Sequence, residues 1–471
     1  MPEQHREHRK VLDEAGRLAR EHLDTIPERH VGARADRDEL HSRVGGPLPE
    51  GATDPSEVLR SLAGDVADGV MASQSPRFFG FVMGGSHPVA LGADWLTSTW
   101  DQNAALHAVS PGASVIEHVA GRWLLDVLHL PAGASVGFVT GGQMATWTCL
   151  AAARGHLLSL AGWDVEADGL HGAPRLRVVA GAGRHGTIDR ALRFLGFGTG
   201  SIIEVPADDQ GRIVADAAVE ALEATDGPTI LALQAGNVNS GSVDPMARLI
   251  PHAHRQGAWV HVDGAFGLWA QASRHRRHLT DGVELADSWS VDAHKWLNVP
   301  FDSGAAIVAD PEPHQRAMGS TAAYLVHDDD LAHDQLNWNP EHSRRARGVP
   351  VWAVLRSLGR DGVEDLVDRL CDRARQFADL LSAADGVEVL NEVVLNQVLV
   401  RFTGTDDPDV HTRSVIERIQ ADGTCWMSGT TWQGQHAMRI SVSNWATSSD
   451  DVDRSVDAIL RCAGEGRTTT G

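Results

Sequence analysis

Residues 288–304 read SWSVDAHKWLNVPFDSG, and the interpretation of the fold starts from this stretch. It begins as an apolar run typical of a buried strand. It then places Lys295 between an imidazole, His294, and an indole, Trp296. A lysine amine becomes a nucleophile or an imine-forming group when burial and neighbouring groups lower its pKa. The stretch therefore predicts imine chemistry at the end of a strand.

Short β-rich runs alternate with helical patterns around this stretch. The expected strands are 134–140, 175–181, 201–206, 229–236, 259–265, 288–294 and 304–310. Apolar residues recur at helical spacing in the runs between them, at 143–160, 187–197, 216–225 and 246–257. This alternation predicts an α/β fold, doubly wound around a largely parallel sheet. Ligands of such sheets bind beyond the carboxyl ends of the strands, where Thr140, Asp263 and Lys295 lie.

The flanking regions suggest three parts. A helix is expected at 110–128, and after residue 350 one or two long helices lead into a small α+β lobe. No linker rich in Gly, Ser or Pro divides the 471 residues. We expect an N-terminal helical segment (1–75), a large α/β domain (76–350) and a small C-terminal α+β domain (351–471).

Composition excludes several classes of partner. The net charge of −22 argues against nucleic acid and against an anionic membrane surface, because both select clustered basic residues. The four cysteines form no CxxC pair, so neither a disulfide framework nor a metal site is expected. The N-terminus is charged and lacks an apolar leader, and no apolar run is long enough to span a membrane. We expect a cytoplasmic protein with small-molecule partners.

Three motifs could carry chemistry at the sheet edge. Thr140, Gly141, Gly142 and Gln143 follow a strand and open a helix, as in phosphate cradles, although a plain glycine-rich turn is the alternative. Asp263 ends a strand and needs a cationic partner, such as a protonated pyridine nitrogen, unless it is a capping residue. His185 lies in a loop before a helix, where a histidine is ordinarily only polar surface.

The order of these motifs resembles a known family. TGGQMA, the RHGTIDRA histidine, HVDGA and DAHKW, with SPGASVIE upstream and RISVSN near the end, resemble the group II pyridoxal-phosphate (PLP)-dependent amino-acid decarboxylases, the family of aromatic-amino-acid, glutamate and histidine decarboxylases. The resemblance runs from about Ser75 to Ile459. It implies PLP fold type I, the aspartate-aminotransferase-like fold, in a homodimer whose active sites form at the interface.

The resemblance also implies roles for individual residues. Lys295 would form the internal aldimine, Asp263 would pair with the pyridine nitrogen, and His185 and Ala265 would cover the two faces of the ring. The phosphate would be held by Gly142 and Gln143, in the Thr140–Gln143 turn, and by His294, with Asp292 nearby. Asn237 falls where the family has a threonine near the substrate or cofactor. Phe78, Phe79 and Phe81 resemble the family's aromatic pocket segment, although a core role is equally open for each.

The match departs from the family after the lysine. Family decarboxylases carry a loop tyrosine that reprotonates the quinonoid carbon, whereas this chain has no tyrosine there. Gln335 falls near that place, with Trp338 following, so both are candidate substrate residues. A different alignment would leave Tyr324, His327 or His333 as the proton donor. Arg439 resembles the small-domain arginine that binds a substrate carboxylate in aminotransferases, with an ordinary ion-pair role as the alternative.

Three hypotheses follow. The first is a PLP-dependent decarboxylase of an amino acid, aromatic or apolar if the phenylalanine segment lines the site. The second keeps PLP but makes an aldehyde or cleaves a carbon–carbon bond, because the loop tyrosine is missing. The third is a PLP-fold protein without catalysis, which the retention of Lys295, Asp263 and His185 disfavours.

Overall fold

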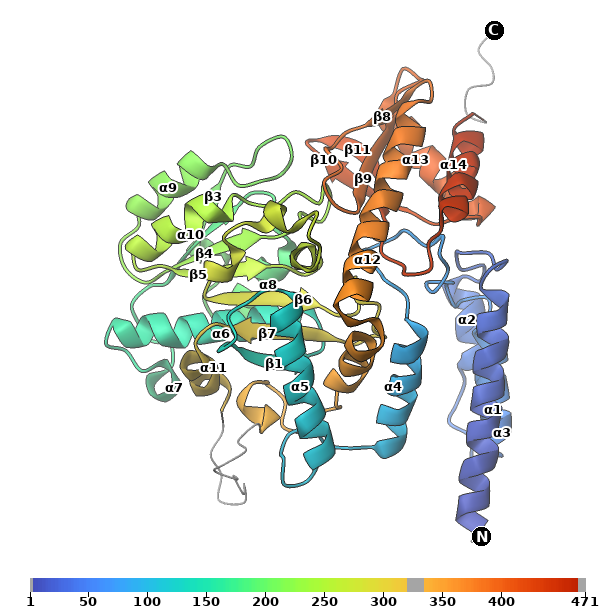
Figure 1. Cartoon of the computed structure of the whole chain (residues 1–471). Coiled ribbons are helices and arrows are strands. Elements are labelled where there is room, and N and C mark those ends of the chain that lie inside the picture. Colours follow the sequence, from blue (N-terminus) through green and yellow to red (C-terminus); the bar gives the residue numbers. More distant parts are fainter. Residues whose placement is uncertain (1–2, 320–333, 465–471) are drawn as a thin grey trace.

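The computed structural model describes residues 3–319 and 334–464, and two β-sheets organise them (Figure 1). The larger sheet has the strand order β1-β7-β6-β5-β4-β2-β3. Its strands are β1 (Ser135–Val139), β2 (Arg177–Gly181), β3 (Ile202–Val205), β4 (Thr229–Gln234), β5 (Trp259–Asp263), β6 (Ser288–Asp292) and β7 (Gly304–Val308). β7 pairs antiparallel with β1 and β6, and the other strand pairs are parallel. The expected α/β fold with a largely parallel sheet is confirmed.

Helices cover both faces of this sheet. They are α5 (Pro111–Val127), α6 (Gly142–Leu160), α7 (Val165–Asp168), α8 (Gly186–Phe194), α9 (Ala215–Glu223), α10 (Met246–Arg255) and α11 (Pro311–Met318). Short 3₁₀ helices lie at Thr199–Ser201, Gly267–Ala272, Arg277–Thr280, Val283–Leu285 and Gln335–Asn337. The helices expected between the strands are α6, α8, α9 and α10.

Small side chains bring α6 close to the sheet. The helix carries consecutive buried alanines, Ala151, Ala152 and Ala153, and it packs on β6 and β7. Thr146 of α6 donates a hydrogen bond to Ser290 of β6 (3.2 Å between hydroxyl oxygens), so two buried polar groups satisfy each other. The close packing places the first turn of α6 at the carboxyl ends of β1 and β6.

The second sheet forms the C-terminal part of the chain. Its order is β10-β11-β9-β8, from β8 (Val387–Val389), β9 (Gln397–Phe402), β10 (Ser428–Trp432) and β11 (Gln435–Ser441). Its pairs are all antiparallel, and α12 (Gly348–Ser382), α13 (Pro408–Asp422) and α14 (Ser449–Gly464) accompany it. α12 bends at Gly359, whose φ of 62° is strained for any other residue. The expected small C-terminal α+β part is confirmed.

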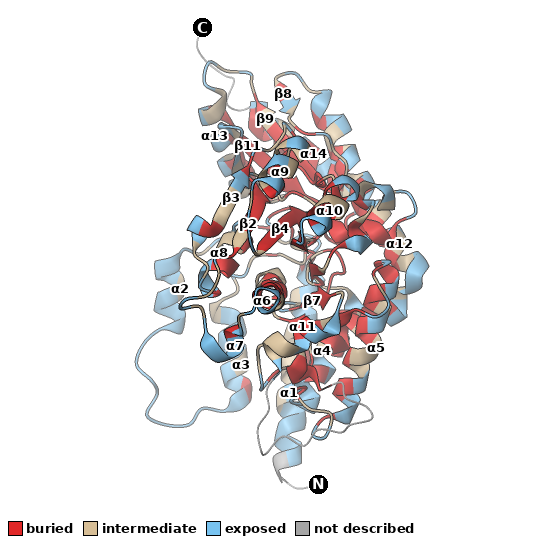
Figure 2. Ribbon diagram, turned by 90° about the vertical axis from the view of Figure 1, so that its left-hand side faces the viewer, coloured by how far each residue is buried: buried red, intermediate tan, exposed pale blue. Residues whose placement is uncertain are grey.

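The N-terminal helices lie at one edge of the molecule. They are α1 (Glu3–Thr25), α2 (Arg37–Val44), α3 (Pro55–Asp65) and α4 (Pro88–Trp100), and α1 packs beside α3. Figure 2 shows α1 to α3 largely exposed, whereas the strands of both sheets are mostly buried. The part boundaries at residues 75 and 350 stay a prediction, and α12 runs across the second of them.

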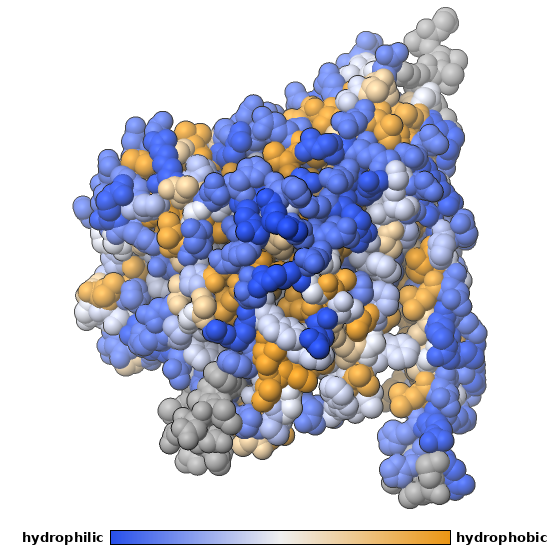
Figure 3. All heavy atoms as spheres, viewed as in Figure 1, coloured by the Kyte–Doolittle hydropathy of each residue, from blue (hydrophilic) through white to orange (hydrophobic). Residues whose placement is uncertain are grey.

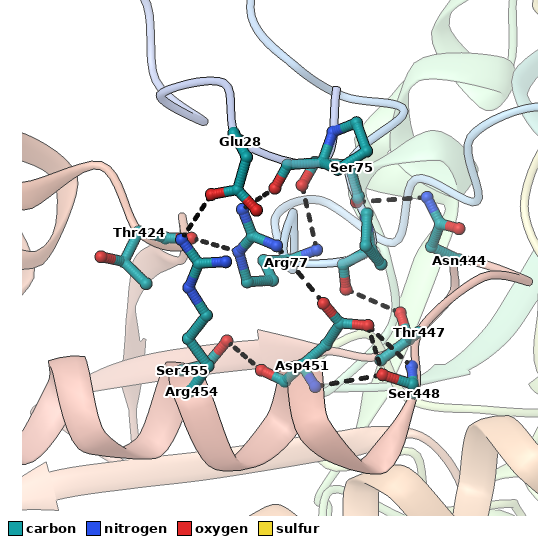
Figure 4. Close-up of polar contacts among 12 residues, drawn as sticks. Glu28, Ser75, Arg77, Thr424, Asn444, Thr447, Ser448, Asp451, Arg454 and Ser455 are labelled. Carbon is teal, nitrogen blue, oxygen red and sulfur yellow. Dashed lines mark hydrogen bonds and ion pairs between the residues drawn. The ribbon is translucent and has the colours of Figure 1, made fainter. Parts of the chain in front are cut away.

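Arg77 ties the N-terminal segment to the C-terminal sheet (Figure 4). Its Nε donates to the carbonyl of Thr424 (2.8 Å) and a terminal nitrogen donates to the carbonyl of Pro27 (2.7 Å). The other terminal nitrogen pairs with Asp451 of α14 at 3.3 Å. Only 4% of the Arg77 side chain is exposed, so these bonds form largely away from water.

In the described residues, no helix is long and apolar enough to cross a membrane.

Candidate functional site

Lys295 lies just beyond the end of β6, half-buried and paired with Asp292. Its Nζ is 2.9 Å from Oδ2 of Asp292. The side chain of Asn298 donates to the Lys295 carbonyl (3.3 Å), and a Cβ on Gly84 would lie only 1.9 Å from that oxygen. The backbone of the lysine is therefore enclosed, and its amine is held at the sheet edge.

Asp292 joins this lysine to the first turn of α6. Its Oδ1 accepts a hydrogen bond from the backbone N–H of Gly142 (2.5 Å) and lies 3.5 Å from Nε2 of His294. Burial by itself would raise the pKa of Asp292, but the charges of Lys295 and His294 outweigh it and hold that pKa below its usual value. Asp292 therefore carries a negative charge between the lysine and the helix N-terminus.

Two glycines make space at this turn. Gly141 has φ of 151°, and a Cβ there would lie 2.8 Å from Cε1 of His294. A Cβ on Gly142 would lie 2.9 Å from Oδ2 of Asp292. The N-cap residue, Gly141, has no side chain, and the first backbone N–H of α6, that of Gly142, donates to Asp292. Gln143, whose amide donates to the Thr187 carbonyl (3.3 Å), connects the turn to the loop of His185.

His294 has a defined tautomer. Its Nδ1 accepts from the backbone N–H of Ser303 (3.2 Å), so its proton lies on Nε2, toward Asp292. Burial lowers the pKa of His294, and the charge of Asp292 opposes that shift. The ring also lies against Phe301, with centroids 4.4 Å apart. The hydrogen bond from Ser303 and the contact with Phe301 fix the ring beside the expected phosphate turn.

His185 lies at the N-cap of α8 and is exposed at the same sheet edge. Its Nδ1 accepts from the backbone N–H of Thr187 (3.3 Å). Desolvation lowers the pKa of His185; the charge of Asp263 opposes this, and Lys295 and Arg439 add to it. Asp263, Lys295 and Arg439 can all influence this imidazole because their three segments converge with the segment of His185.

Asp263 ends β5, next to the lysine strand, and Ala265 lies two residues beyond it. Oδ1 of Asp263 accepts from the backbone N–H of Ala265 (3.2 Å), and both residues are half-buried. The Ala265 carbonyl accepts from the backbone N–H of Asp292 (2.9 Å). The two strand ends are thus hydrogen-bonded to each other, with the Asp263 carboxylate at the site.

Asn237 is buried in the loop after β4, where its side chain organises the backbone. Its Nδ2 donates to the Gly183 carbonyl (3.0 Å), and its Oδ1 accepts from the backbone N–H of Asn239 (2.9 Å) and of Ser240 (3.3 Å). These bonds tie the loop to the segment before His185.

The sequence did not predict a role for Asn239, Gly84 or Asn298, because their contacts come from distant segments. The consecutive glycines at 84 and 85 were the one local indication of a close backbone approach.

The aromatic segment divides between core and surface. Phe79 is fully buried in the main apolar core, edge-on to Phe377 with centroids 4.9 Å apart. Phe78 is also buried and stacks on Trp426. Phe81 is 58% exposed and lies against the same indole. Phe78 and Phe79 are thus buried in this chain, which is one of the two roles left open by the sequence, and the substrate role of Phe79 and Phe81 stays a prediction.

Gln335 and Trp338 contact the opposite end of β1. Both line a cavity of about 300 Å³ with Glu117 of α5 and Ser135, the first residue of β1. The Trp338 carbonyl accepts from His314 of α11 (3.1 Å). Among the described residues, no hydrogen bond or ion pair joins either side chain to Lys295, and the substrate role of Gln335 and Trp338 stays a prediction. Tyr324, His327 and His333 lie outside the described residues.

Comparison with solved structures defines the class of protein. The chain superposes on a crystal structure of Oryza sativa TDC with PLP and tryptamine at a TM-score of 0.92, covering 99% of this chain and 100% of that chain at 24% sequence identity. This likeness shows a shared fold, an α/β architecture with a small C-terminal sheet.

Sequence comparison then gives the family. Residues 44–403 match the pyridoxal-dependent decarboxylase conserved domain. The chain is 26% identical to an aromatic-L-amino-acid decarboxylase of Bacillus atrophaeus over 458 residues, covering 95% of this chain and 93% of that protein. It is 25% identical to a phenylacetaldehyde synthase of Arabidopsis thaliana, with 84% of each chain covered. The chain belongs to the group II PLP-dependent decarboxylase family, a family of carboxy-lyases.

Proposed function

We propose that this protein is a PLP-dependent amino-acid decarboxylase in which Lys295 bonds covalently to the cofactor. The observation that carries the proposal is the convergence of Lys295, Asp263 and His185 at one sheet edge beside the start of α6. When bound, PLP supplies an electron sink for the bond broken at the substrate Cα.

The residues fit such a group by their chemistry. Gly141 and Gly142 leave a cradle that a Cβ would fill, and the start of a 19-residue helix attracts a phosphate. Asp263, an acid at the mouth of the sheet, would hold a proton on a ring nitrogen. His185 is exposed and free to cover a flat ring. Ala265 is small enough to allow close approach from the opposite side.

Asp292 and His294 would act at the two ends of the cofactor. The Asp292 carboxylate lies 2.9 Å from the Lys295 nitrogen, so it can hold a proton at this nitrogen. His294 would donate from Nε2 toward a phosphate oxygen, because its Nδ1 already accepts from Ser303. The guanidinium of Arg439 would receive a carboxylate of the substrate.

The test uses the two lysines of the chain, Lys10 and Lys295. PLP-loaded protein is reduced with borohydride and digested, and mass spectrometry locates the pyridoxyl group. We expect the label on Lys295 and its loss in Lys295→Ala, together with the loss of CO2 and amine release from an amino-acid panel.

Lys10→Ala is the matched control, because Lys10 is exposed and pairs only with Asp54 at the surface. It should keep the label and the activity. A label on Lys10 alone, or CO2 release that survives Lys295→Ala, would contradict the proposal.

A second candidate function is aldehyde formation or carbon–carbon cleavage. It is favoured by the tyrosine-free stretch 325–350 and by the relatedness to a phenylacetaldehyde synthase. Measuring hydrogen peroxide, ammonia and aldehyde beside CO2 and amine separates the two reactions. Amine as the sole organic product would exclude this candidate.

We also propose a homodimer, as the family resemblance implies. Helix α4 exposes Trp95 (45%), Leu96 (50%) and Trp100 (48%), and Figure 3 shows apolar surface beside the projecting helix α1. A cavity of about 680 Å³ lies between these helices and α14. Apolar surface of this kind is typical of protein interfaces. Light scattering during gel filtration should give twice the mass of one chain.

A further inference from the structure

Arg439, in the middle of β11, is a buried cation without an acidic partner. Its residue exposure is 8%, and within residues 3–319 and 334–464 its guanidinium makes one hydrogen bond, from a terminal nitrogen to Oδ1 of Asn239 (3.3 Å). Its Nε has no hydrogen-bond partner there. A buried guanidinium without a carboxylate is costly, since lost hydration is not repaid. The arginine therefore has the capacity to bind an anion.

The site lies within the electrostatic reach of this cation. The charge of Arg439 lowers the pKa of His185, together with that of Lys295. β11 thus delivers a positive charge from the second sheet to the edge of the first sheet. An anion bound by Arg439 would therefore lie near His185.

Asn239 decides how the guanidinium is held. Its Oδ1 accepts from Arg439 and also from the hydroxyl of Thr430 (2.9 Å). The amide is neutral, so it orients the guanidinium without cancelling its charge. An aspartate of the same shape would form a salt bridge here and occupy the donors of the arginine.

The same asparagine is fixed from the large sheet. Its backbone N–H donates to Oδ1 of Asn237, whose Nδ2 donates to the Gly183 carbonyl. Gly183 lies two residues before His185. One hydrogen-bonded chain therefore runs from the His185 loop through Asn237 and Asn239 to Arg439.

We propose that Asn239 is a positioning residue that holds Arg439, still fully charged, to receive a carboxylate of the substrate. The inference rests on the proposed function, because it assigns the carboxylate to an amino acid bound at Lys295. That carboxylate is either the α-carboxylate or an acidic side chain. A guanidinium on the departing α-carboxylate would stabilise the reactant more than the transition state, so the source matters for the reaction.

The decisive variant is Asn239→Asp, which changes charge and almost no volume. The probes are 3-phenylpropanoate and glutarate, each compared with its amide, 3-phenylpropanamide or glutaramide. Their binding to the PLP-loaded protein is measured by calorimetry, without turnover. We expect the wild type to prefer acid over amide by about tenfold or more, and Asn239→Asp to lose that preference while its melting temperature stays equal or rises.

Two further variants serve as controls for Asn239→Asp. Asn239→Ala removes the acceptor without adding charge and should reduce the acid preference only in part. Thr430→Val removes a hydrogen bond to Asn239 but keeps the acceptor of Arg439, so it should leave most of the preference. With substrate, Asn239→Asp should raise KM by about tenfold or more with a smaller change in kcat.

The outcomes separate this inference from the proposed function. Loss of preference for 3-phenylpropanoate assigns Arg439 to the α-carboxylate, and loss for glutarate alone assigns it to an acidic side chain; both support the inference. An acid preference that is absent in the wild type, or equal in wild type and Asn239→Asp, would overturn it. Failure of PLP to bond to Lys295 would instead contradict the proposed function, and it is read from the reduction experiment.

Discussion

Arg344 and Arg439 are both buried arginines, and their surroundings differ in one respect. The side chain of Arg344 is 0% exposed and meets Glu117, whose side chain is equally buried; it also donates to the carbonyls of Ala104 (3.1 Å) and Phe138 (2.8 Å). Among the residues that the structure describes, the guanidinium of Arg439 has one hydrogen-bond partner, the amide of Asn239. A buried arginine that forms an ion pair with a carboxylate of the same chain stabilises the fold, whereas a buried arginine without an acidic partner is available to bind a ligand.

The largest expected effect is on the paired arginine. Arg344→Met leaves the Glu117 carboxylate buried without its cation, so the free energy of unfolding should fall by about 3 to 5 kcal/mol. Urea denaturation of the PLP-loaded protein measures it. The double variant Glu117→Leu/Arg344→Met removes both charges and should recover most of the loss. A cost below about 1 kcal/mol for Arg344→Met would remove the distinction between the two arginines.

The next effect concerns His314, a buried side chain that also has its polar atoms satisfied. Its Nδ1 lies 2.8 Å from the hydroxyl of Ser135 and its Nε2 donates to the Trp338 carbonyl. Burial lowers the pKa of His314 to about 4 from an ordinary 6.5. As the pH falls from 6.5 to about 4, this histidine takes up a proton in the unfolded chain but stays neutral in the folded chain, so the free energy of unfolding decreases.

The size of this loss is about 3 kcal/mol between pH 7 and pH 4. It is measured as the difference between the wild type and His314→Gln, which cannot titrate, in unfolding experiments at each pH. That difference should shrink as the pH falls. A constant difference would show that His314 takes up its proton at the same pH in the folded and the unfolded chain.

The smallest effect on stability is expected at the unpaired arginine. Arg439→Gln removes a buried charge without leaving an acid behind, so the free energy of unfolding should change by less than about 1 kcal/mol. Binding of 3-phenylpropanoate or glutarate should weaken by about tenfold, equivalent to about 1.4 kcal/mol. Thermal unfolding and calorimetry measure the two quantities. Large destabilisation with unchanged binding would make Arg439 a structural arginine like Arg344.

Local pattern was enough to predict the strands of the large sheet and the segments at their ends. Each strand is a short apolar run, and its period and boundaries can be recognised from consecutive residues. Parallel strands bring their carboxyl ends to one edge of the sheet. Lys295 and Asp263 could therefore be expected at the site without coordinates. The same pattern could not show that Phe79 packs on Phe377, because an apolar residue reads alike in a core and in a pocket.

The sequence by itself determined the α/β fold and the family, because those depend on local periodicity and on ordered motifs. The tertiary structure decided which charges are paired. Arg344 meets Glu117 across 227 positions of the chain, and Arg439 meets Asn239 across 200. Whether a buried charge faces an acid or an amide depends on which distant segments the packing brings together, and no local pattern records it.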